Sequence, residues 1–261
     1  MNYKKIIVEK KEKITYISMN SPENLNAFDE LILQEMTDAL DCCEKDESCK
    51  VIVINGLGKG FSAGGDIQGM KKYLEKDISD FFRPVLKNIS ILALRIRDIG
   101  KPVIASVHGA AAGAGFNLAL CCDFIVSSEK AKYVQAFVNI GLIPDMGGTY
   151  FLSKALNPSK TMEFAMLGDV ISAKKLYELG VINFLSEDDE LAEETEKLAL
   201  KLASKPSESL RKTKELVNKI NYPELSEFLD IEYEYQIQLA NEKDFAEGIN
   251  AFLEKRKPEF S

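Results

Sequence analysis

Two glycine-rich turns are the segments of this 261-residue chain best suited to hold a reactive oxygen atom. Residues 60–67 read Gly-Phe-Ser-Ala-Gly-Gly-Asp-Ile, and residues 109–117 read Gly-Ala-Ala-Ala-Gly-Ala-Gly-Phe-Asn. Small side chains leave backbone N–H groups unobstructed, and a helix that begins in the second turn would direct its first N–H groups at a ligand oxygen. Two such turns facing one point could form an oxyanion hole, but tight packing of a helix on a strand explains either turn alone.

A third segment, residues 137–149, carries a single ionisable side chain, that of Asp145. Its neighbours Ile143, Pro144 and Met146 are apolar, so we expect a poorly solvated carboxyl group. Its pKa should then rise from an ordinary value of about 3.9 toward that of a general base. Asp is also a common residue at a helix N-cap, and the local sequence alone favours that structural role over a catalytic one.

The segments around these turns repeat a strand–turn–helix order, which predicts an α/β layered core. Apolar or β-branched runs predict strands, and apolar residues at helical spacing predict helices. The predicted strands cover residues 6–8, 14–19, 51–54, 102–107 and 124–126, and the predicted helices cover residues 29–40, 116–122, 149–156 and 172–180.

The character of the chain changes after about residue 187. Four charged segments with helical periodicity follow, at residues 191–202, 207–220, 223–239 and 245–256, with prolines at the joints. We therefore predict a core over residues 1–190 that contains the site and a helical oligomerisation region over residues 191–261. Amphipathic helices need a partner surface, which could belong to a neighbouring subunit or to the same chain.

Composition narrows the function classes. The formal net charge of −8 disfavours binding to nucleic acid or to anionic lipid. Five cysteines show neither a disulfide framework nor a metal-ligand spacing, which favours reduced thiols in a cytoplasmic protein. His108 is the single histidine, so a catalytic triad would have to use it and a multi-histidine metal site is excluded. The N-terminus shows no signal-peptide pattern, and although residues 102–122 are apolar enough to suggest a membrane helix, Pro102 and interspersed glycines argue against one.

Taken together, these segments resemble the enoyl-CoA hydratase/isomerase (crotonase) superfamily. The resemblance spans nearly the whole chain, and its motifs keep their order and spacing. They are Ser-Pro-Glu-Asn-Leu-Asn-Ala at 21–27, Phe-Ser-Ala-Gly-Gly-Asp at 61–66, Gly-Ala-Gly-Phe-Asn at 113–117, Ile-Gly-Leu-Ile-Pro-Asp-Met-Gly-Gly-Thr at 140–149 and the tail at 251–260.

The resemblance implies a spiral of ββα units followed by C-terminal helices, assembled as a homotrimer or as a pair of trimers. It implies that the backbone N–H groups of Gly65 and Ala114 form the oxyanion hole. It implies no cofactor, because the CoA or pantetheine arm belongs to the acyl-CoA or acyl-carrier-protein substrate. It places along that arm, or closing over its nucleotide end, the residues Asn24, Leu25, Asn26, Ala27, Ala63, Asp66, Ile67, Lys257 and Phe260.

The chain departs from the hydratases of the family at two positions. Those enzymes add water with two glutamates, and the matching positions here hold Asn117 and Phe137, which cannot transfer a proton at neutral pH. Each lost acid/base group is worth roughly 10²–10⁴ in rate. Asp145 instead matches the single acid/base of several family isomerases, and Phe137 would keep water from the intermediate. The predicted reaction is therefore a 1,3-proton shift that converts a 3-enoyl thioester into a 2-enoyl thioester through a dienolate.

Other reactions of the same fold stay open. The substrate could be a ring-derived CoA thioester of aromatic catabolism, or the protein could still be a hydratase. A dehalogenase of the family uses an aspartate as nucleophile but depends on tryptophan, which this chain lacks. A catalytically silent protein that binds thioesters or RNA would explain the lost glutamates, but the acidic composition argues against RNA and Asp145 argues for chemistry.

Overall fold

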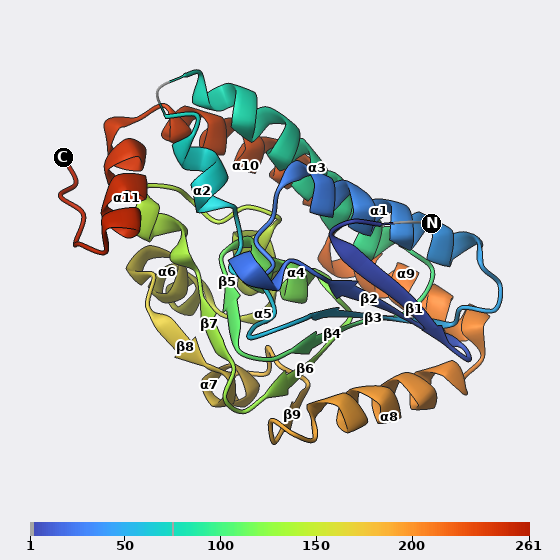
Figure 1. Cartoon of the computed structure of the whole chain (residues 1–261). Coiled ribbons are helices and arrows are strands. Elements are labelled where there is room, and N and C mark those ends of the chain that lie inside the picture. The colour runs from blue at the N-terminus through green and yellow to red at the C-terminus, as the bar shows by residue number, and fades with distance from the viewer. Residues whose placement is uncertain (1–2, 75) are drawn as a thin grey trace.

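The computed structural model describes residues 3–74 and 76–261. Its main sheet has six strands in the order β1-β2-β3-β4-β6-β9 (Figure 1). Strands β1 and β2 pair antiparallel, and each further pair is parallel. A smaller sheet has the order β5-β7-β8. The strands are β1 Ile6–Lys11, β2 Ile14–Met19, β3 Val51–Gly56, β4 Val103–Val107, β5 Ala110–Ala112, β6 Phe124–Ser128, β7 Lys132–Val134, β8 Val170–Ser172 and β9 Phe184–Ser186.

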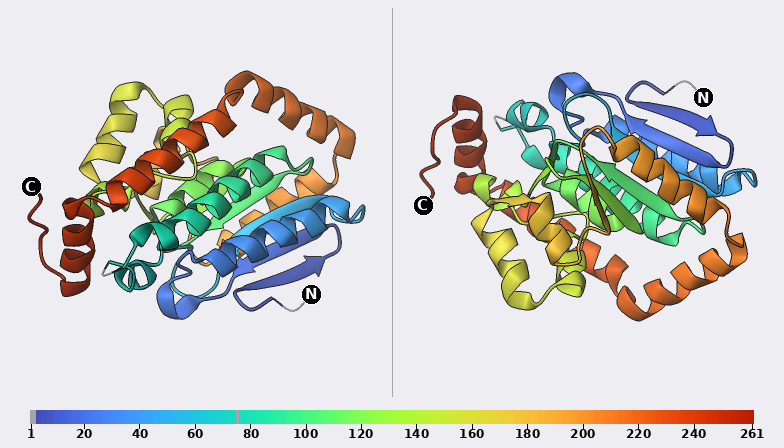
Figure 2. Two further views of the ribbon diagram at one scale, coloured as in Figure 1. Left: turned by 90° about the horizontal axis from the view of Figure 1, so that it is seen from above. Right: turned by 90° about the horizontal axis from the view of Figure 1, so that it is seen from below.

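Helices cover both faces of the main sheet, which confirms the predicted α/β class. Helices α1 (Glu30–Lys45) and α3 (Ile78–Asp98) lie over one face, and α8 (Leu191–Ala203) crosses the other (Figure 2). Strand β3 contributes side chains to both faces of the sheet. Ile52 and Ile54 lie in the large core, whereas Val51 and Val53 pack with α8. This alternation follows from side chains pointing to opposite faces along a strand. The other helices are α2 Ile67–Lys71, α4 Ala114–Cys121, α5 Gly148–Ala155, α6 Pro158–Leu167, α7 Ala173–Glu178, α9 Ser207–Asn221, α10 Leu225–Ala240 and α11 Lys243–Glu254, with short 3₁₀ turns η1 Pro22–Asn24 and η2 Ala136–Ile140.

The predicted strands and helices are present, with ends that differ by a few residues. The apolar segment at residues 102–122 forms β4, β5 and α4, so the membrane-helix interpretation is wrong. In the described part of the chain, no helix has both the length and the apolar character to cross a membrane. Helix α3 had no predicted counterpart, and it carries Pro84, a residue that ordinarily ends or kinks a helix.

The C-terminal helices pack on their own chain. Helix α10 lies along α3, and α11 lies against η2 and α2. The contact with η2 is close, because a β-carbon added to Gly248 would lie 2.5 Å from the Cα atom of Ile140. The sequence left open whether these helices pack on a neighbouring subunit or on the same chain. The structure shows that α10 and α11 pack on the same chain. The role of residues 191–261 in assembly stays a prediction.

Candidate active site

The two glycine-rich turns run side by side. The Ser62 N–H donates to the Ala110 carbonyl over 3.0 Å, and the Ala112 N–H donates to the Ser62 carbonyl over 2.9 Å. At Gly64 the turns touch, since an added β-carbon would lie 2.6 Å from the Ala112 oxygen and 3.2 Å from the Ala114 nitrogen. Gly64 also has φ +85°, a conformation that side chains disfavour. Glycine at this position therefore permits the close approach that brings the first turn to the start of α4.

Two backbone N–H groups at this meeting point, those of Gly65 and Ala114, donate no hydrogen bond to another residue in the described part of the chain. The bridge to Phe28 uses the Gly64 carbonyl and the Asp66 N–H, so the N–H of the intervening Gly65 lies outside that pairing. Ala114 is the first residue of α4, and its N–H has no carbonyl one turn earlier to accept it. The structure thus brings Gly65 and Ala114 to one place. Their role as oxyanion donors stays a prediction.

Phe137 covers the start of α4. Its side chain is 7% exposed, and its ring lies 3.5 Å from the position of a β-carbon added to Gly113. The residue that replaces a hydratase glutamate here is therefore an apolar wall beside Ala114. Such a wall limits access of water to that point.

Asp145 is buried, with 7% of its surface exposed, and its Oδ1 atom has no hydrogen-bond partner among the described residues. Burial raises the pKa of this carboxyl group from 3.8 to about 7. The N-cap of α5 is Gly147, with no side-chain capping bond. The structure therefore does not show the capping role that the local sequence favoured for Asp145, although its backbone carbonyl does accept the Gly148 N–H over 2.8 Å.

Asn117 holds the backbone of the Asp145 loop. Its Nδ2 atom donates to the Asp145 carbonyl over 2.8 Å, and its Oδ1 atom accepts from Nε2 of Gln135 over 2.7 Å. Asn117 and Gln135 are both fully buried. The second position of a hydratase glutamate is thus occupied by a structural amide whose donor and acceptor are both used.

Helix α10 supplies two further contacts to the same loop, which the sequence did not reveal. Glu232 accepts the Gly147 N–H over 2.7 Å, and Gln236 donates to the Ile143 carbonyl over 2.8 Å. Both side chains are buried. The sequence does contain a pattern that could have indicated these contacts. Glu232 and Gln236 lie four residues apart on the helix face that also carries Leu225 and Leu229, so they fall within an apolar stripe. Polar residues in a buried helix stripe mark a specific partner.

The predicted substrate segment at residues 24–27 lies against the first turn. The Ala63 N–H donates to the Leu25 carbonyl over 2.9 Å, and the Leu25 side chain is exposed. Asn26 is fully buried, and its Nδ2 atom donates to the carbonyls of Leu57 and Gly60 over 2.9 and 3.1 Å. Contact between Asn26 and a substrate would therefore come from its main chain. The partly buried Asn24 and the buried Ala27 complete this segment, and Asp66 and Ile67 form the start of α2 beside it.

The predicted tail residues Lys257 and Phe260 are exposed. The tail folds back on α11, where the Glu259 N–H donates to Glu247 and the Ser261 N–H donates to Asp244, each over 2.8 Å. Figure 1 shows the C-terminus beside α11, away from α4. The tail therefore packs against α11 of the same chain. That Lys257 and Phe260 close over the nucleotide end of the substrate stays a prediction.

Comparisons with known proteins identify the family of the chain. Residues 9–261 match the enoyl-CoA hydratase/isomerase family. The trans-2-decenoyl-[acyl-carrier-protein] isomerase of Streptococcus mutans is 33% identical over 100% of this chain and 99% of its own. The crotonyl-CoA hydratase of Syntrophomonas wolfei is also 33% identical, over the same shares. An enoyl-CoA hydratase structure from Mycobacterium avium subsp. paratuberculosis superposes with a TM-score of 0.91 at 30% identity over 100% of both chains. The chain belongs to the enoyl-CoA hydratase/isomerase (crotonase) superfamily.

Proposed function

We propose that this enzyme moves the double bond of an enoyl thioester from C3 to C2, with Asp145 as its single acid/base. The observation that carries the proposal is the buried carboxyl group of Asp145, whose Oδ1 atom has no hydrogen-bond partner among the described residues and whose pKa of about 7 suits proton transfer in both directions. The two positions of the hydratase glutamates hold Asn117, which is engaged with the protein, and Phe137, which cannot titrate. Asp145 is then the group available to transfer protons.

The proposed reaction needs one base and one pair of N–H donors. The Asp145 carboxylate takes a proton from C2, and the electrons of that C–H bond form a C1–C2 double bond as charge moves to the thioester oxygen. The N–H groups of Gly65 and Ala114 stabilise this dienolate oxygen. The protonated Asp145 then donates to C4, the double bond forms between C2 and C3, and the thioester carbonyl returns. No water enters the balance, which fits the apolar cover provided by Phe137.

The names of the relatives support a thioester substrate and leave two reactions to separate. The Streptococcus relative is an isomerase of a carrier-protein thioester, whereas the Syntrophomonas relative is a hydratase of a CoA thioester. Because both are 33% identical to this chain over its whole length, hydration is the second candidate function. We propose acyl-CoA or acyl-carrier-protein thioesters as the substrate class for either reaction.

The test follows isomerised and hydrated products separately, from 3-enoyl and 2-enoyl thioesters. We expect isomerisation without appreciable hydration. In Asp145→Asn, isomerisation should fall by at least roughly 10²-fold while thioester binding persists, because Asn keeps the size of the side chain and removes the base. Asp169→Asn changes an exposed aspartate and serves as the matched control. A wild-type enzyme that readily hydrates 2-enoyl thioesters, together with a fully active Asp145→Asn variant, would overturn the proposal.

We also propose that the chain assembles as a homotrimer or a pair of trimers. Apolar side chains remain exposed on α9 and α6, where Leu216, Ile220 and Met166 are 60%, 74% and 66% exposed. A second copy of the chain would cover such surfaces. Light scattering at micromolar concentration should give three or six times the mass of the chain, and a monomeric mass would contradict the proposal.

A further inference from the structure

The loop that carries Asp145 is held at three backbone positions by buried side chains from outside the loop. The Ile143 carbonyl accepts from Gln236, the Asp145 carbonyl accepts from Asn117, and the Gly147 N–H donates to Glu232. The three contacts fall on every second residue of the loop, and Asp145 is the middle one. A carboxyl group on α10 therefore fixes the backbone two residues from the proposed base.

Glu232 lies in apolar surroundings with only part of its bonding capacity used. It is 4% exposed, and its Oε1 atom has no partner among the described residues. It lines a cavity of about 350 Å³ whose other walls include Ile143, Met162 and Phe228. Such a site disfavours a charged carboxylate.

The groups that face Glu232 include no cation in the described part of the chain. They are the Asp145 carboxyl group across the loop, the Cys121 thiol of α4, whose pKa is raised by burial, and the Tyr235 hydroxyl group on the same cavity. Burial raises the pKa of Glu232 from 4.5 to about 9; the hydrogen bond from the Gly147 N–H partly offsets this rise, and the nearby Asp145 adds to it by a smaller amount. The pKa of Asp145, about 7, is lower than that of Glu232, about 9, so Asp145 ionises first and Glu232 keeps its proton near neutral pH.

We propose that Glu232 is a positioning residue for the isomerisation, an uncharged anchor that holds the Gly147 end of the loop so that the Asp145 carboxyl group faces the substrate. The inference rests on the proposed function. It assigns to α10 a part in catalysis without contact with the substrate. A neutral anchor fits this task because it adds no second negative charge beside the base.

The test uses two substitutions of Glu232 in the full chain. Glu232→Gln keeps an oxygen that accepts the Gly147 N–H but cannot ionise, whereas Glu232→Met has similar length and no such oxygen. Glu234→Gln and Glu234→Met change an exposed residue of the same helix and serve as matched controls. Each variant is assayed for kcat and KM from pH 6 to 10.5 and for thermal unfolding over the same range.

At pH 7, Glu232→Met should lower kcat by about 10²-fold with little change in KM, since a misplaced base loses rate and not binding. Glu232→Gln should retain the wild-type kcat at pH 7. Above pH 9 the wild type should lose activity as Glu232 ionises beside Asp145, and Glu232→Gln should not. Equal kcat values for Glu232→Met and the wild type would overturn the inference, as would the same alkaline loss in the wild type and Glu232→Gln.

Thermal unfolding gives a readout that does not depend on turnover. The folded protein keeps the Glu232 proton while the unfolded chain loses it, so this group makes the wild type less stable as pH rises from 4.5 to about 9. Glu232→Gln should lack that decrease, and an unchanged pH dependence would exclude an uncharged buried Glu232. If Asp145→Asn is fully active, the proposed function fails. If Asp145→Asn is inactive and Glu232→Met is fully active, only the positioning role fails.

Discussion

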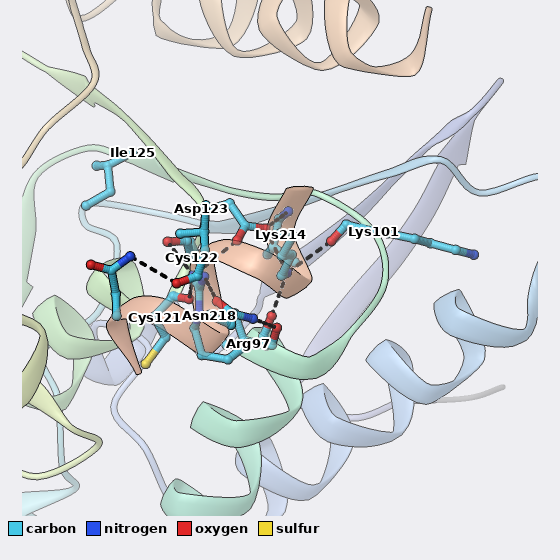
Figure 3. A network of polar contacts seen from close by, with 12 residues as sticks. Arg97, Lys101, Cys121, Cys122, Asp123, Ile125, Lys214 and Asn218 are labelled. Carbon is cyan, nitrogen blue, oxygen red and sulfur yellow. Dashed lines mark hydrogen bonds and ion pairs between the residues drawn. The ribbon is translucent and has the colours of Figure 1, made fainter. Parts of the chain in front are cut away.

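Two buried polar clusters join the C-terminal helices to the core, and they are built in opposite ways. Under α9, Asp123 pairs with Arg97 over 3.1 Å and with Lys214 over 2.8 Å (Figure 3). Lys214 also donates to two backbone carbonyls, and Arg97 lies over the Tyr222 ring at 5.0 Å. Under α10, Asp145 and Glu232 are both acids, and neither forms an ion pair in the described part of the chain.

The difference separates a structural cluster from a reactive one. In the Arg97–Asp123–Lys214 cluster each charge has an opposite partner, and one Arg97 nitrogen, Nε, remains without a hydrogen bond among the described residues. In the Asp145–Glu232 pair, one oxygen of each carboxyl group has no hydrogen-bond partner among the described residues, and both pKa values lie far above their ordinary range. Perturbed acids without partners are typical of functional sites, whereas paired buried charges mainly fix one arrangement of the chain.

The largest effect on stability should come from breaking the paired cluster. Asp123→Asn leaves Lys214 and Arg97 as buried cations without a counter-ion, and we expect a loss of about 3–5 kcal/mol in the free energy of unfolding. The value of kcat should be retained, because in the described part of the chain no hydrogen bond or ion pair joins Arg97, Asp123 or Lys214 to the Asp145 loop. Urea unfolding at pH 7 measures the loss. Glu194→Gln, which removes the exposed pair with Lys197, is the control and should cost less than about 1 kcal/mol.

The outcome decides between two descriptions of the cluster. A loss of turnover at full stability would mean that the Asp123 cluster serves catalysis. The contrast between the two clusters would then be wrong.

Asp145→Asn should change the free energy of unfolding in the opposite direction and stabilise the protein. The pKa of Asp145 is raised from 3.8 to about 7, so the unfolded chain ionises first and the folded wild type becomes less stable as pH rises through this range. That difference corresponds to about 4 kcal/mol above pH 7, which Asn does not experience. We expect the unfolding free energy of Asp145→Asn to exceed that of the wild type at pH 8 by up to this amount. Near pH 3.5 the two proteins should be equally stable.

The comparison of unfolding curves at the two pH values tests the burial of the charge directly. An Asp145→Asn variant that is less stable than the wild type at pH 8 would show that the carboxylate makes favourable contacts. A structural role for Asp145 would then regain support.

The sequence predicted local features of the site better than its long-range contacts. The glycines of the first turn and the apolar neighbours of Asp145 act within a few residues, so their effects can be inferred from the chain in order. Asn117 meets Asp145 across 28 positions, and Glu232 meets Gly147 across 85. Such contacts depend on how α4 and α10 pack; the helical spacing of Glu232 and Gln236 indicates a buried partner but does not identify it. The same limit applies to Asn26, whose resemblance suggested substrate contact but whose amide holds residues 57 and 60.

The smallest of these effects, measured as free energy, should come from removing one N–H group at the meeting point of the turns. Ala114→Pro deletes the proposed oxyanion donor at the first position of α4, where proline is well tolerated in helices. We expect turnover to fall by about 10²–10³, equivalent to about 2.7–4 kcal/mol of transition-state stabilisation. The fall should appear in kcat, because the donor is needed most when charge develops on the thioester oxygen. Circular dichroism and unfolding verify that the variant is folded, and Pro158, already at the start of α6, shows that this chain accepts proline at such a position. A folded Ala114→Pro variant with unchanged turnover would exclude Ala114 as an oxyanion donor and leave Gly65 as the single proposed donor to the dienolate oxygen.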